Sequence, residues 1–76
     1  MTQLKEVEKE WLTAMAGLSR GEDPIRQTYA LKQAWLELEN YPEWHGKALL
    51  MKSQEIAQEI LNKHPEWSSE IVRVGR

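Results

Sequence analysis

The chain has 76 residues, no cysteine and a formal net charge of −2. A chain of this length forms one small domain, which buries only about 60% of the surface of the unfolded chain. Disulfide bonds are excluded as a source of stability. The positive and negative charges are interleaved without a basic block, which argues against a general attraction for DNA or RNA.

No apolar run approaches the roughly 18 residues that a membrane-spanning helix needs. The segment from Met1 to Lys9 alternates in charge, so it lacks the apolar core of a signal peptide. We therefore expect a soluble, cytoplasmic protein in which residues 1–76 form a single domain. Association with itself or with another protein would compensate for the small core.

A first amphipathic helix is expected over residues 3–19, because apolar side chains recur there at steps of three and four residues. Thr2 is a possible N-terminal cap, and Gly21 is a good helix terminator. Asp23 and Pro24 have the pattern of a cap followed by the first residue of the next helix. The apolar stripe comprises Leu4, Val7, Trp11, Ala14, Met15 and Leu18.

A second helix is expected over residues 24–39, and it is apolar around more than half of its circumference. Such a helix in a small protein contacts neighbours on two sides, so we expect it to be the central element. Alternatively, one of its stripes is a seam between two copies, for which we single out Leu31, Trp35 and Leu38. One stripe comprises Ile25, Tyr29 and Leu36, and the other comprises Leu31, Ala34 and Leu38, with Trp35 between them.

The tripeptide Pro-Glu-Trp occurs twice, at residues 42–44 and 65–67. Proline disfavours helical geometry in the residue before it, yet it suits the first turn of a helix. The glutamate is then favoured by the positive end of the helix dipole, and the tryptophan supplies an apolar anchor. We interpret each copy as a corner between two helices, built in the same way twice rather than by internal duplication.

A third helix is expected over residues 42–63, with Asn40 and Glu43 at capping-box spacing. A short fourth element near residues 65–73 follows it. The β-branched run in that element leaves open the alternative of an extended tail. The core stripe of the third helix comprises Gly46, Leu49, Leu50, Ser53, Ile56, Ala57, Ile60, Leu61 and His64.

The residue pattern offers little support for catalysis or metal binding. There is no thiol, no glycine-rich phosphate loop and no His-x-x-x-His spacing, so we assign no catalytic residue, no metal ligand and no cofactor. His45 and His64 are far apart, and His64 is expected to bond the last carbonyls of its helix. A small bundle offers little concave surface, so we expect neither an enzyme nor a small-molecule substrate.

Three of the four tryptophans have the helical phase of core residues: Trp11 and Trp35 lie at the centres of their apolar arcs, and Trp67 has the phase to cap the core below His64. Trp44 differs, because it falls opposite the core stripe of the third helix. Either another segment of the chain covers it, or it belongs to an exposed patch for a protein partner, since Trp and Met are enriched at interface cores. This hypothetical patch comprises Trp44, Ala48 and Met51, flanked by Lys47 and Lys52.

A nucleic-acid-binding function is the alternative, because two helices joined by a short corner resemble a helix-turn-helix. On that interpretation the outer face of the third helix would enter a groove, and this face carries Trp44, His45, Lys47, Lys52 and Gln54. Glutamates on the same helix and the negative net charge argue against it.

These expectations combine into an all-α fold, a small antiparallel three-helix bundle with a short C-terminal fourth helix or extended tail. Within it we expect a non-enzymatic protein-protein interaction module. Its partner would be another protein or a second copy of the chain, with homodimerisation through the second helix as the main variant.

Overall fold

The computed structural model describes residues 3–71, and every regular element among them is helical. The small all-α bundle is confirmed. Within this range no helix is both long and apolar enough to cross a bilayer. The elements are α1 (Leu4–Ser19), α2 (Pro24–Leu38), the 3-10 helix η1 (Ala48–Leu50), α3 (Ser53–Lys63) and α4 (Trp67–Glu70).

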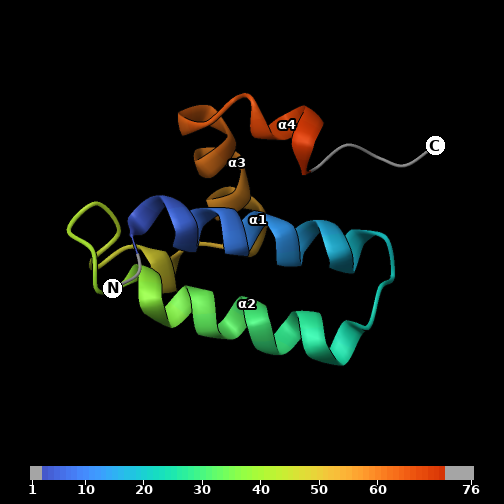
Figure 1. The fold of residues 1–76 in the computed structure, drawn as a ribbon. Helices are drawn as coiled ribbons and strands as arrows, with labels where there is room; N and C mark the ends of the chain where they lie inside the picture. The colour runs from blue at the N-terminus through green and yellow to red at the C-terminus, as the bar shows by residue number, and fades with distance from the viewer. Residues whose placement is uncertain (1–2, 72–76) are drawn as a thin grey trace.

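In the turn between α1 and α2, Gly21 ends α1 and Pro24 begins α2 as expected, whereas Asp23, the expected cap, has a left-handed φ of 33° and makes no side-chain cap hydrogen bond. Gly21 adopts a φ of 74°, and its N–H donates to the Leu18 carbonyl at 3.0 Å. The next N–H, from Glu22, donates to the Gly17 carbonyl at 2.9 Å. These two bonds form a Schellman motif, which satisfies the last carbonyls of α1 and reverses the chain. Helices α1 and α2 consequently lie side by side and antiparallel (Figure 1). The cap proposed at Thr2 lies outside the described residues.

Helix α1, rather than α2, is the central element. It lies between α2 on one side and α3 on the other (Figure 1), and it packs against both. Its buried residues point in more than one direction around the helix, whereas those of α2 form a single stripe. The expectation that α2 is central is therefore wrong. The buried residues of α1 are Val7, Glu8, Trp11, Leu12, Ala14, Ala16 and Gly17, and those of α2 are Leu31, Ala34 and Leu38.

The third helix expected over residues 42–63 is interrupted. Gly46 adopts a φ of 80°, a left-handed conformation that leaves the α-helical path. Met51 and Lys52 are extended, with ψ of 150° and 154°, so α3 begins only at Ser53. Residues 39–52 form a loop of turns that carries η1. The continuous outer face on which the nucleic-acid interpretation depended is therefore not formed.

The last described element is a helical turn, α4, and its Ile71 cap packs against the core. The extended alternative for the tail concerns mainly residues 72–76, which lie outside the described residues.

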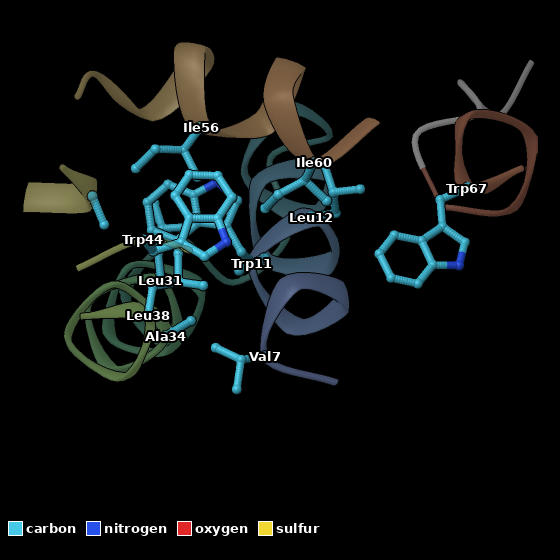
Figure 2. Packing of buried hydrophobic residues seen from close by; sticks show 12 residues of the cluster. Val7, Trp11, Leu12, Leu31, Ala34, Leu38, Trp44, Ile56, Ile60 and Trp67 are labelled. Carbon is cyan, nitrogen blue, oxygen red and sulfur yellow. The ribbon is translucent and has the colours of Figure 1, made fainter. Parts of the chain in front are cut away.

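One apolar cluster joins the helices. Figure 2 shows Trp44 in the same cluster as Trp11, between Ile56 of α3 and Leu31 and Leu38 of α2. The Trp11 and Trp35 rings meet edge to face, with centroids 5.5 Å apart. A loop residue, Trp44, thus occupies the space that an uninterrupted third helix would have filled.

Candidate interaction surface

The exposed patch expected around Trp44 does not exist. Trp44 is 1% exposed, Ala48 is fully buried and Met51 is half-buried against the core. The expectation assumed that Trp44, Ala48 and Met51 lie on one face of a continuous helix. The helix is interrupted at Gly46, so helical phase does not relate Trp44 to the two later residues. Lys47 is held in place as well: its Nζ lies 2.6 Å from Glu59 Oε2 and 5.1 Å from the centroid of the Trp44 ring. Lys52 is exposed at the start of α3.

Trp44 instead serves as a hydrogen-bond donor inside the molecule. Its Nε1 donates to Oε2 of Glu8 at 2.9 Å, and this carboxylate is only 1% exposed. Lys63 Nζ donates to the same oxygen. His64 Nε2 lies 2.9 Å from Oε1 and donates to it when that nitrogen carries the proton. The expectation that the His64 ring bonds the last carbonyls of its helix is therefore wrong.

Glu8, Trp44, Lys63 and His64 form a group that we call the Glu8 cluster. Both Pro-Glu-Trp corners contribute to it. In each corner the backbone N–H of the tryptophan donates to the backbone carbonyl of the residue before the proline, at 2.9 Å for Trp44 and 3.0 Å for Trp67. Trp67 then stacks on the His64 ring, with centroids 4.1 Å apart. The two corners are built alike, and they fix one buried carboxylate from two directions.

The Glu8 carboxylate is buried and joins α1, the loop and the end of α3. Burial raises the pKa of Glu8, but the hydrogen bonds from Lys63, Trp44 and His64 outweigh it and hold the pKa below the usual value of 4.5. Among residues 3–71 there is no group of three or more His, Asp or Glu side chains placed to hold a metal ion.

A second carboxylate, that of Glu39, organises the loop after α2. It accepts hydrogen bonds from the Gly46 N–H at 3.0 Å and the Leu49 N–H at 3.3 Å. The first of these bonds is the main reason why the pKa of Glu39 is lowered. The His45 Nδ1 also lies 2.9 Å from the Glu39 carbonyl. The loop is thus tied to the end of α2, and this positions η1 beside α2.

The seam proposed at Leu31, Trp35 and Leu38 is part of the core. Leu31 and Leu38 are buried in the apolar cluster. Trp35 is half-buried, and its Nε1 donates to the Ala48 carbonyl at 2.5 Å, which joins α2 to η1. Leu31 and Leu38 are therefore wrong as members of a dimer seam, because core packing already occupies them, whereas Trp35 is half-buried and lines a groove beside η1.

The other stripe of α2 is exposed, as is the adjoining part of η1. We call this region the α2–η1 surface and define it as Ile25, Tyr29, Leu36 and Leu49. Leu50, which is 85% exposed, extends it along η1. The exposed fractions of its four members are 85% for Ile25, 66% for Tyr29, 49% for Leu36 and 51% for Leu49.

A groove of about 310 Å³ lies within the α2–η1 surface, between α2 and η1. Trp35 forms part of its wall, and its hydrogen bond to η1 keeps the two elements at a fixed separation. The only charged lining residue is Lys32, whose aliphatic stem can cover apolar surface while the ammonium stays in water. The lining residues are Thr28, Leu31, Lys32, Trp35, Leu36 and Leu49.

A larger hollow of about 690 Å³ lies along the α1–α2 pair, and it is different in character. Its walls combine Glu6, Lys9 and Glu10, which are exposed charged side chains of α1, with Tyr29 of α2. These charges are spaced as on an ordinary solvated helix face, so this hollow is a weaker candidate than the α2–η1 groove.

Comparison of the chain with protein-family models, with curated proteins and with solved structures produced no match. Two features were missed by the sequence interpretation: the buried Glu8 and the exposure of Leu49 and Leu50. The stripe of Ile25, Tyr29 and Leu36 was recognised as apolar beforehand, but it was not the stripe chosen as the seam.

Proposed function

We propose that this protein is a non-enzymatic protein-interaction module, and that it binds through the α2–η1 surface. The observation that carries the proposal is the exposure of Ile25, Tyr29 and Leu36 along one face of α2, with Leu49 beside Leu36 in the groove. A single exposed leucine needs no explanation in a soluble protein. Several large apolar side chains arranged along one helix face and around a groove are typical of protein-protein contact sites.

The mechanism is recognition by a preformed surface. The groove wall is fixed by the Trp35 bond to η1, and η1 is fixed by the Glu39 bonds to the loop. A rigid surface loses little conformational entropy on binding, so more of the contact energy appears as affinity. The Glu8 cluster contributes at a distance by holding α1, α3 and the loop together.

We propose that the protein binds a protein partner in the cytoplasm and that it uses neither a cofactor nor a small-molecule substrate. The α2–η1 surface favours an amphipathic helix as the bound element, because a helix presents apolar side chains at the spacing of a second helix face. No observation favours nucleic acid, since the surface is apolar at its centre and the net charge is −2.

The proposal is tested by affinity capture from native lysate of cells that also express an untagged copy of the chain. The bait is compared with a Leu36→Glu variant and with Glu10→Arg, a charge change on the exposed part of α1. We expect the captured protein, whether a different chain or the untagged copy, to be lost with Leu36→Glu and retained with Glu10→Arg. Equal capture by the wild type and Leu36→Glu would contradict the proposal.

A further inference from the structure

We infer that the occupant of the α2–η1 surface is a second copy of this chain, bound by antiparallel pairing of the two α2 helices about a twofold axis. The inference depends on the proposed function, because it names the partner of the same surface. It is carried by the positions of the exposed side chains along α2 and by the charges beside them.

The exposed stripe of α2 has the spacing of a helix-packing face. Ile25, Tyr29, Lys32 and Leu36 follow one another at steps of four, three and four residues. At about 100° per residue they fall within roughly 60° of one another, on the side of α2 opposite the buried stripe. This face is therefore free to meet another helix without disturbing the contact between α2 and α1.

An antiparallel arrangement matches these side chains in complementary pairs. If the two α2 helices cross between residues 30 and 31, Ile25 of one protomer faces Leu36 of its partner, since both are equally far from the crossing point. Tyr29 and Lys32 are also equidistant from it, so each Tyr29 ring faces the Lys32 of its partner. The lysine stem can then lie on the ring with its ammonium in cation–π contact. The twofold axis repeats each pair, as an isologous interface requires.

Charges on the flank of α2 select the antiparallel direction. Arg26 lies in the first turn of α2 and Glu37 in the last, and at 100° per residue they share one flank of the helix. Both are exposed, and neither forms an ion pair with a residue that the structure describes. Antiparallel pairing brings each Arg26 close to the Glu37 of its partner. Parallel pairing about a twofold axis would place Arg26 of one protomer and Glu37 of the other on opposite flanks of the seam, so this attraction would be lost.

The groove accounts for the exposure of Leu49. In this arrangement Ile25 of the partner arrives at Leu36, and Leu36 and Leu49 belong to the same groove wall. The isoleucine side chain thus fills a recess at one end of α2, while its own α2 offers the same recess at the other end. One protrusion and one recess per protomer give two identical contacts in the dimer.

The size of the surface limits the expected affinity. Stable complexes bury about 1,200–2,000 Å² in total, and one helix face with a short adjoining segment lies near or below the lower end of that range. We therefore expect a reversible dimer with a dissociation constant of about 1–100 μM.

Sedimentation equilibrium of the purified chain across about 5–500 μM tests the inference. We expect a monomer–dimer equilibrium for the wild type and for the Glu10→Arg control. Leu36→Glu is expected to remain monomeric while keeping its helical circular dichroism, since Leu36 is not part of the buried core. A wild type that stays monomeric throughout would overturn the inference. The proposed function would still be judged separately by the capture of a different chain.

Charge exchange tests the direction of pairing. Arg26→Glu and Glu37→Arg should each weaken the dimer by about tenfold, and the double variant should restore it because the same pairs form with reversed signs. In a parallel dimer neither single change would introduce a repulsion between residues 26 and 37 of the two protomers, because these residues would lie on opposite flanks of the seam. Failure of the double variant to recover, with wild-type helical content, would refute the antiparallel arrangement.

Discussion

The indole N–H of Trp44 donates a 2.9 Å hydrogen bond to the buried carboxylate of Glu8, and so joins a loop to the first helix across 36 positions of sequence. This bond explains why Trp44 points inward, although helical phase places it outside. A buried carboxylate must be paired and hydrogen-bonded to be tolerated, and Trp44 supplies one of its donors. Helices α1, α3 and α4 and the loop are thus organised around a polar centre as well as an apolar one.

The first prediction compares two buried tryptophans. Trp44→Phe and Trp11→Phe remove similar volumes from the core, but only Trp44 donates to a carboxylate. The Trp11 Nε1 is buried with no hydrogen-bond partner among the described residues. We expect Trp44→Phe to lower the free energy of unfolding by about 1.5–3 kcal/mol more than Trp11→Phe does. Urea denaturation measures both, and equal losses would show that the bond to Glu8 contributes nothing.

The second prediction concerns the dependence of stability on pH. The pKa of Glu8 is lower in the folded protein than in the unfolded chain, so its ionised form stabilises the fold. That contribution is fully present above the unfolded pKa of about 4.5, and it is lost as the pH falls through the lowered folded value. Below about pH 4.5, we expect the free energy of unfolding of Glu8→Gln to depend less steeply on pH than that of the wild type.

The matched control for this prediction is Glu22→Gln. The pKa of Glu22 is also lowered, by its hydrogen bond with Arg20, but both side chains are exposed at the surface. We expect Glu22→Gln to follow the wild-type profile closely. At neutral pH, Glu8→Gln should be destabilised by about 2–3 kcal/mol, because Lys63 and His64 lose the charge that they face. A pH profile of Glu8→Gln that parallels the wild type would contradict the assignment.

The third prediction concerns the residue that interrupts the expected third helix. Gly46 has a φ of 80°, and a Cβ added there would meet no atom within 4 Å. The cost of Gly46→Ala is therefore conformational rather than steric, about 1–2 kcal/mol. Gly46→Asn should cost less, since asparagine tolerates the left-handed region. Thermal unfolding distinguishes the two variants, and a neutral Gly46→Ala would mean that residues 42–52 can continue as a helix.

The fourth prediction concerns the loop that carries η1. Glu39→Gln keeps the shape of the side chain but weakens its hydrogen bonds to the Gly46 and Leu49 amides. We expect faster hydrogen exchange at these two amides, with little change in the amides of α1. If the loop moves, η1 no longer holds Leu49 beside Leu36, so dimerisation should weaken as well. Unchanged exchange at both amides would show that Glu39 does not organise the loop.

The limits of sequence interpretation follow from particular residues. The bounds of α1 and α2 were predicted to within one residue, because Gly21, Asp23 and Pro24 punctuate the chain by local chemistry. The third helix was predicted too long, since Gly46 was counted as a small core residue although its left-handed conformation ends the turn. The sequence feature that could have indicated this break is Gly46 itself, which lies only four residues after Pro42.

The choice between the two stripes of α2 could not be made from helical period alone, because both are apolar. It depends on how many neighbours α2 has, and that is a property of the assembled fold. Glu8 did carry a signal: it stands seven residues before Met15, which was placed on the core stripe, so its phase is that of a core residue. A carboxylate at such a position predicts a buried polar partner, and the histidine at the end of α3 was available to supply one.

The central claim, that α2 meets a second copy of itself in antiparallel register, is tested most directly by isotope-filtered NOE spectroscopy on a mixture of labelled and unlabelled chains. Within one protomer Ile25 and Leu36 are eleven residues apart on the same helix, a separation of about 16 Å, which is too far for an NOE. The account predicts intermolecular NOEs between the methyl groups of Ile25 and Leu36 at millimolar concentration. Contacts of Ile25 with Ile25, or no intermolecular NOE at all, would contradict it.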